Sequence, residues 1–336
     1  MSNINDFVIE NGSLKKYTGT EAEVVIPEGV KYISGGVFAN CTTIESVYIP
    51  DGVRSIYYRA FKNCTNLKSV RLPADIFSVE HDAFDGCANL ADENGFVIIN
   101  NTLYTYFGDA EVVTIPESVT EIGDGVFCAK YGVKEIFLPE SLKKIGYYTF
   151  GEMNGITIRI PKAVRPNLFD EDTFKERGYD EYTDHFRGDR KSVPYVLDFE
   201  CEDGDHAVYV ILRLNNDYTS FNPTFSTYTT ENGVDFAEYD EDVINGKRFK
   251  APDKLYAALL RMTYPKDMNE YVCGWYTEFL QKNAKKAVAF ACETDNDTFI
   301  KTLIGIDAIN AKNAKALKKQ IEEAGAAKCL AAIEEI

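Results

Sequence analysis

The sequence of 336 residues predicts a repeat protein of the α+β class, in which a β-solenoid is followed by a mixed segment and an α-helical tail. Two observations support this prediction. A hydrophobic motif recurs every 22 or 23 residues in the first half of the chain, and apolar residues take up helical spacing in the last quarter. Periods of roughly 20 to 50 residues are typical of solenoids, whose units bury their apolar faces only against one another.

Each repeat is marked by an apolar residue followed by proline, and the steps between these prolines are 23, 23, 43, 23 and 22 residues. A phenylalanine falls eleven positions after the proline in five units. This spacing predicts a column of phenylalanines in one continuous core, with Cys41, Cys64 and Cys87 stacked nearby as reduced thiols. The phenylalanines are Phe38, Phe61, Phe84, Phe127 and Phe150. The dipeptides are Ile26-Pro27, Ile49-Pro50, Leu72-Pro73, Ile115-Pro116, Leu138-Pro139 and Ile160-Pro161.

The 43-residue step contains one ordinary unit and an insertion of 20 residues. The inserted run Phe96–Asn100 matches Phe7–Asn11 at an offset of 89 residues, and Leu103 and Tyr106 match Leu14 and Tyr17. Both runs have β-rich segments joined by a polar turn that contains asparagine. We therefore expect a hairpin before the first repeat and another before the fourth.

The pattern IPxxVxxIxxxxFxxCxxLxxV, read from Ile49 to Val70, resembles the BspA-like leucine-rich repeat of the Treponema pallidum type. The resemblance covers roughly residues 7 to 165. The sequence departs from the pattern at Lys130, which replaces the repeat cysteine, and at Asn167 and Asp172, where the sixth unit loses its core positions. The resemblance implies a right-handed solenoid with one strand per unit and a role in recognition, and it implies no chemistry.

The strands before each proline alternate, so that Val47 and Ile49 are expected to face the core while Ser46 and Tyr48 face solvent. Six such strands would form a sheet about 24 Å long, with an exposed strip of only a few hundred Å². A standard interface buries about 800 Å² per partner, so a folded partner would also need the hairpins or the helical tail. Plain solubilising surface is the alternative interpretation. The predicted partner-binding residues are Tyr48, Arg71, Thr114, Phe137 and Arg159.

Charge and composition suggest three domains: the solenoid over residues 1–166, an acidic connector with short strands over 167–250, and a helical domain over 251–336. Their net charges are −6, −11 and zero. In the connector, we expect a charged stretch over 170–191 and two strands near 195–199 and 207–214, joined by the acidic turn 202–205. Six helices are expected after Pro252. This tail resembles the ankyrin-like helical ends of some intracellular BspA-like proteins.

The sequence favours a protein without enzymatic activity, metal or cofactor. No phosphate-binding, zinc-binding or nucleophile motif occurs. The net charge of −17 disfavours nucleic acid as a partner, and no apolar run is long enough to insert in a membrane. No secretory signal is visible at the N-terminus, so a cytoplasmic location is expected unless a signal was removed.

These observations predict a scaffold that binds other proteins through the exposed solenoid sheet and the helical tail. One alternative is a secreted adhesin that binds host proteins. Another is a hydrolase with a site in residues 195–250, where Cys201 and His206 flank an acidic turn containing Asp203 and Asp205. Neighbouring carboxylates raise the pKa of a thiol and weaken it as a nucleophile, and the turn lacks the ligand spacing of an EF-hand loop.

Overall fold

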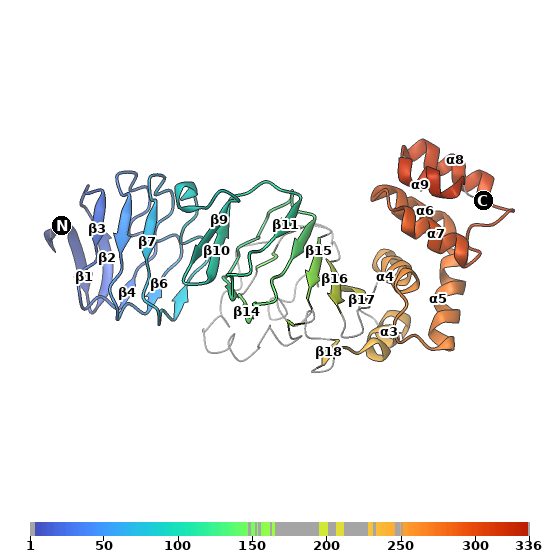
Figure 1. Cartoon of the computed structure of the whole chain (residues 1–336), viewed down its shortest axis with the longest axis horizontal. Helices are drawn as coiled ribbons and strands as arrows, with labels where there is room; N and C mark the ends of the chain where they lie inside the picture. Colours follow the sequence, from blue (N-terminus) through green and yellow to red (C-terminus); the bar gives the residue numbers. More distant parts are fainter. Residues whose placement is uncertain are drawn as a thin grey trace. The chain divides into compact units, whose positions relative to one another are not determined.

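The computed structural model describes residues 4–146, 149–151, 153, 156–161, 163–164, 195–200, 206–211, 228–230, 233–245, 249 and 251–334 (Figure 1). The chain forms two compact units. The first comprises Met1–Asn154 and Ala163–Tyr182, and the second comprises Gly155–Lys162 and Thr183–Ile336. The domain boundaries expected at residues 166 and 250 lie outside the described residues, as do the charged stretch 170–191 and the acidic turn 202–205.

The first unit starts with a repeat array that is headed by a hairpin, which confirms the first predicted hairpin. A 3-10 turn, η1 (Ile4–Asp6), leads into the antiparallel strands β1 (Phe7–Glu10) and β2 (Ser13–Tyr17). Strands β4 (Tyr32–Ile33), β6 (Ser55–Ile56) and β8 (Ser78–Val79) continue this sheet in parallel. A second, parallel sheet contains β3 (Glu23–Val25), β5 (Ser46–Tyr48) and β7 (Ser69–Arg71).

A second array follows in the same unit and repeats this order at an offset of 89 residues. After the 3-10 turn η2 (Ala88–Leu90), the inserted run forms a hairpin of β9 (Phe96–Ile99) and β10 (Thr102–Tyr106). Strands β12 (Glu121–Ile122) and β14 (Lys144–Ile145) extend that sheet, and β11 (Val112–Thr114) pairs with β13 (Glu135–Phe137). The insertion is therefore the hairpin that begins the second array, as β1 and β2 begin the first.

The expectation of one continuous six-stranded sheet is wrong. Strands β3, β5 and β7 form a sheet of their own, and β11 and β13 belong to another. The physical reason is the chain between β7 and β11, which forms β8, η2 and the second hairpin before it returns to this face. The exposed surface is thus divided between two shorter sheets.

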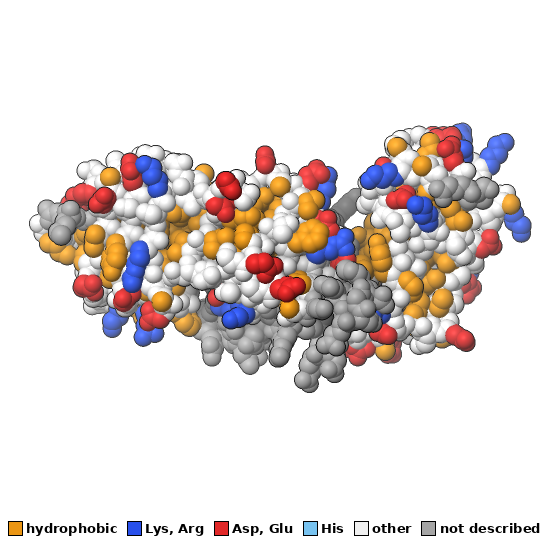
Figure 2. Space-filling view, viewed as in Figure 1, with side chains coloured by type: hydrophobic (Ala, Val, Ile, Leu, Met, Phe, Trp, Pro, Cys, Tyr) orange, Lys and Arg blue, Asp and Glu red, His pale blue; other side chains and the backbone are white. Residues whose placement is uncertain are grey.

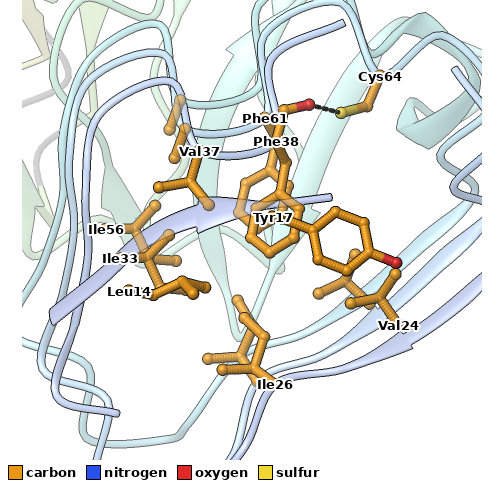
Figure 3. Close-up of a cluster of buried hydrophobic side chains, with 14 of the residues drawn as sticks. Leu14, Tyr17, Val24, Ile26, Ile33, Val37, Phe38, Ile56, Phe61 and Cys64 are labelled. Carbon is orange, nitrogen blue, oxygen red and sulfur yellow. Dashed lines mark hydrogen bonds between the residues drawn. The ribbon is translucent and has the colours of Figure 1, made fainter. Parts of the chain in front are cut away.

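The predicted phenylalanine column is confirmed as the core of both arrays. The rings of Phe38 and Phe61 stack with centroids 4.9 Å apart, and those of Phe127 and Phe150 are 5.9 Å apart. Figure 3 shows Phe38 and Phe61 among aliphatic side chains from both sheets. The thiols of Cys64 and Cys87 are buried, and each donates to a carbonyl oxygen one turn back, at 3.1 and 3.0 Å. These bonds satisfy polar groups inside the apolar column.

The second unit contains strands and seven helices among its described residues. Strand β15 (Thr157–Ile160) pairs in parallel with β16 (Tyr195–Glu200), and β16 pairs antiparallel with β17 (His206–Ile211). The hairpin of β18 (Thr229–Thr230) and β19 (Gly233–Val234) follows. The helices are α3 (Phe236–Asn245), α4 (Ala251–Thr263), α5 (Glu270–Lys282), α6 (Ala284–Glu293), α7 (Asp297–Gly305), α8 (Ala314–Ala324) and α9 (Ala327–Ile333).

The six helices expected after Pro252 are confirmed. Asn269 and Asn296 cap α5 and α7 by accepting backbone N–H bonds, and Gly325 ends α8 in the left-handed conformation. Helix α6 packs on α8 and α7 packs on α9, as stacked helix pairs do. Helix α3 was not expected, because it lies in the acidic segment that the sequence predicts as a connector.

A buried ion pair joins three helices of this unit. The guanidinium of Arg261 in α4 donates to both carboxylate oxygens of Asp240 in α3, at 2.8 and 2.7 Å, and the hydroxyl of Tyr276 in α5 donates to the same carboxylate at 2.8 Å. The centre of the Phe236 ring lies 3.8 Å from the guanidinium carbon of Arg261. All three polar side chains are buried, and their mutual bonds replace most of those that water would make, although Nη1 of Arg261 has no hydrogen-bond partner among the described residues.

Candidate partner-binding surface

The first candidate surface lies on the sheet β3-β5-β7, and we call it strip 1. It consists of Val25, Tyr48 and Arg71, which occupy the same position on three neighbouring strands. The residues that precede them on β3 and β5, Val24 and Val47, are buried. The alternation expected from the sequence is therefore confirmed, and Tyr48 keeps 44% of its surface exposed.

The side chains of strip 1 are held in place by contacts on the surface. The guanidinium carbon of Arg71 lies 4.9 Å from the centre of the Tyr48 ring. The same guanidinium donates to the carbonyl oxygen of Ile49 at 2.7 Å and to the carboxylate of Asp51 at 2.6 Å. An exposed ion pair adds little to stability. Its effect here is to fix the orientation of the arginine over the aromatic ring, which reduces the entropy lost on binding.

Asp51 is a member of this cluster that the sequence reasoning missed. It follows Pro50 in the turn after β5 and lies on the turn next to Arg71. The sequence contains a signal for this contact, because solenoid positions 20 to 23 residues apart lie close together in space. The same rule accounts for the turn-to-turn ion pairs Lys68–Glu45 and Lys134–Glu111.

The second candidate surface lies on β11 and β13, and we call it strip 2. It consists of Val112, Thr114 and Phe137, all exposed, with Thr114 and Phe137 side by side in the parallel register. Phe137 occupies the position that Tyr48 has in the first array, and 38% of its surface is exposed. Figure 2 shows hydrophobic side chains over the solenoid with charged residues among them.

The fifth predicted residue, Arg159, lies in the second unit on β15. It forms an ion pair with Asp198, its register partner on β16. The carboxylate of Asp198 is buried, whereas Arg159 is partly exposed. Arg159 therefore compensates a buried charge within its own unit. Tyr48 thus lies beside Arg71, Thr114 beside Phe137, and Arg159 beside Asp198.

Within the described part of the chain, no three histidine, cysteine or acidic side chains are grouped to hold a metal ion. Burial raises the pKa of the Cys41 and Cys292 thiols, which keeps them protonated at neutral pH. Cys201, Asp203 and Asp205, the residues of the hydrolase hypothesis, lie outside the described residues. Among the helices that are described, none has the length and apolar character needed to cross a bilayer.

Comparison with known proteins identifies the repeats. The chain matches the family described as the BspA type leucine-rich repeat region, in six copies over residues 8–95 and 97–177, half of its length. No curated protein matches the chain.

Comparison with solved structures finds similarity to bacterial leucine-rich repeat proteins over about half of the chain. The leucine-rich repeat protein of T. pallidum is 24% identical with a TM-score of 0.30, and the match covers 49% of this chain and 73% of that one. A leucine-rich cell surface protein of Faecalibacterium prausnitzii is also 24% identical with a TM-score of 0.32, covering 60% of this chain and 58% of that one. The pneumococcal vaccine antigen PcpA is 16% identical with a TM-score of 0.25, covering 51% and 43%.

Proposed function

Because the chain belongs to the BspA type leucine-rich repeat family, we propose that it is a non-enzymatic interaction protein that binds a folded protein partner through strip 1 and strip 2. The observation that carries this proposal is the ordered cluster of Tyr48, Arg71 and Asp51 on an exposed sheet. Aromatic and arginine side chains provide most of the binding energy at protein interfaces when the partner removes them from water.

The size of the surface favours a partner that touches more than one strip. A three-stranded sheet spans only about 10 Å across its strands, so strip 1 alone is much smaller than the roughly 800 Å² per partner of a standard interface. Strip 2 adds a second aromatic anchor in the same unit, and the helical tail adds exposed aromatic side chains such as Tyr271. The net charge of −17 favours a neutral or basic partner.

The test compares two tyrosines with matched exposure. Tyr48 lies in strip 1 with 44% of its surface exposed, and Tyr58 lies in a turn after β6, outside both strips, with 45% exposed. Tagged wild-type protein, Tyr48→Ala and Tyr58→Ala are used to capture proteins from the native lysate. A true partner is retained by the wild type and by Tyr58→Ala and is reduced with Tyr48→Ala.

The captured protein is then purified and its affinity measured by calorimetry. We expect Tyr48→Ala and Phe137→Ala each to weaken binding by more than about 1 kcal/mol, roughly fivefold in Kd. Amide exchange of the complex should show protection at β5 and β13. Unchanged affinity in both variants, with protection elsewhere, would rule out the strips as the binding surface.

A further inference from the structure

The two hairpins of the first unit have the same sequence pattern but different surroundings. Val8 in β1 and Val97 in β9 are equivalent at the offset of 89 residues. Val97 is completely buried, whereas Val8 is 43% exposed. Their neighbours Phe7 and Phe96 are both buried, so the two hairpins differ at the next position along the strand.

The side of the second hairpin that faces away from its own array, which we call its outer side, packs against the first array. Ile99 and Tyr104 pack on the hydrophobic core of the first array, where the Tyr104 ring meets Phe84 edge-on with centroids 5.9 Å apart. The side-chain amide of Asn100 donates to the carbonyl oxygens of Leu72 and Pro73, at 3.3 and 3.2 Å. Three residues on the outer side of this hairpin therefore contact the first array.

At the first hairpin, an apolar centre on the edge strand stays in contact with solvent. Ile4, Val8 and Ile9 are all exposed, and β1 is the edge strand of the sheet β1-β2-β4-β6-β8 at the N-terminal end of Figure 1. An exposed apolar edge strand is a pairing site unless charges or a covering segment protect it. Glu10 and Lys15 stand where the second hairpin has Ile99 and Tyr104. They place one negative and one positive charge beside the apolar centre.

We propose that the outer side of the first hairpin binds a second copy of the chain, head to head about a two-fold axis. This end surface consists of Ile4, Val8, Ile9, Glu10 and Lys15. Under two-fold symmetry the same patch meets itself, so Val8 and Ile9 pack on their symmetry mates while Glu10 of one chain faces Lys15 of the other. Carrying both signs of charge makes the patch complementary to itself, which favours a second copy over a partner of uniform charge.

The contact is separate from the two strips, and its size is moderate. The end of a solenoid offers several hundred Å², close to the lower limit of specific interfaces. We therefore expect a reversible dimer whose population rises with concentration. Sedimentation velocity of the full chain, with no added residues at its N-terminus, should show a shift from monomer to twice the monomer mass as concentration increases.

Val8→Asp tests the apolar centre of this surface. We expect it to raise the dissociation constant at least tenfold, because two carboxylates would meet across the axis. Tyr58→Asp is the control, since it adds a carboxylate at a side chain of similar exposure outside the end surface. It should leave the dimer unchanged. Circular dichroism should show both variants folded.

Charge exchange tests the two-fold arrangement. Lys15→Glu places Glu10 opposite a second acid and should also weaken the dimer tenfold or more. The double variant Glu10→Lys with Lys15→Glu restores opposite charges and should recover the wild-type dissociation constant. A monomer at every concentration would overturn the proposal. So would assemblies larger than a dimer, which a head-to-tail contact produces, or a dimer that survives Val8→Asp.

Discussion

At the scale of single residues, the position of a residue in the repeat predicts its burial only where turns of the same array pack on both sides of it. The phenylalanines meet this condition, because each contacts the turn before it and the turn after it. Val8 and Val97 do not, since they hold equivalent positions in the two hairpins but differ in what covers them. The same residue in the same local sequence is exposed in one case and buried in the other.

Substitutions at these two valines should therefore differ in their effect on stability. Val97→Asp is expected to lower the free energy of unfolding by more than about 3 kcal/mol, because it buries a carboxylate without a partner. Val8→Asp is expected to cost less than about 0.5 kcal/mol. Urea unfolding at low protein concentration, where the chain is monomeric, measures both. Similar losses in the two variants would contradict the difference in burial.

Buried tyrosines should make the protein sensitive to alkali. Burial raises the pKa of Tyr104 to about 12, and it also raises the pKa of Tyr106 and of Tyr256. Tyrosine in an unfolded chain has a pKa of about 10. The folded state thus holds the phenol protons more tightly. Their contribution to stability is complete below about pH 10 and is lost as the pH rises through the folded pKa values.

Urea unfolding between about pH 8 and about pH 11 should show this decline. Absorbance at 295 nm should show a group of tyrosines that ionise only with unfolding. Tyr104→Phe removes one of the titrating groups, so the free energy of unfolding of this variant should fall less steeply with pH than that of the wild type. An identical pH dependence in this variant would show that Tyr104 does not contribute.

At the scale of elements, the sequence predicted the helices and strands whose apolar pattern is uninterrupted. In α5, Val272, Tyr276 and Leu280 recur at every fourth position and are buried. Helix α3 has a similar stripe of Phe236, Tyr239, Asp240 and Val243, but one member is a carboxylate. A charged residue in the stripe interrupts the apolar pattern, so the pattern does not predict a buried helix here. Asp240 can be buried because the guanidinium of Arg261 in α4 pairs with it.

Gly274 in the middle of α5 is expected to be replaceable. A Cβ atom at this position would meet no atom within 4 Å, and glycine costs about 0.5 to 1 kcal/mol relative to alanine in a helix interior. Gly274→Ala should therefore raise the free energy of unfolding by about this amount. Gly146→Ala is the contrasting variant, because its Cβ would lie 2.5 Å from the backbone of Gly123, and it should destabilise. Thermal unfolding of both variants measures the difference.

The buried ion pair should be essential to the helices that it joins. Asp240→Ala leaves the Arg261 charge buried without its partner, and we expect a loss of about 3 to 5 kcal/mol. The double variant Asp240→Leu with Arg261→Met removes both charges and should recover most of that loss. If the single and double variants are equally unstable, the cost arises from lost packing and not from the uncompensated charge.

At the scale of the whole molecule, the chain contains a unit built from repeats and a unit dominated by helices, each with its own buried core. Separate cores predict that thermal unfolding deviates from a single two-state transition. Calorimetry should resolve two unfolding transitions. Val97→Asp should lower the midpoint temperature of one, and Asp240→Ala should lower that of the other. A single transition that both variants shift equally would show that the units unfold together.

The candidate surface illustrates how far sequence analysis reaches. Strand alternation correctly placed Tyr48 and Phe137 on exposed faces, because that property depends on the strand alone. It did not find Asp51 beside Arg71, and it did not find Asp198 beside Arg159. Both acids are brought to their arginines by the pairing of turns or strands that are separated in the chain.

The sequence by itself determined the repeat period, the duplicated hairpin, the phenylalanine column and the late helices, since each arises from a regular spacing of apolar residues. Only the tertiary structure decided that the repeat strands divide into separate sheets, that Asp240 and Arg261 are buried together, and that Val8 is exposed while Val97 is not. The reason is physical: burial and pairing depend on what packs against the far side of a residue, and its neighbours in the chain do not determine this.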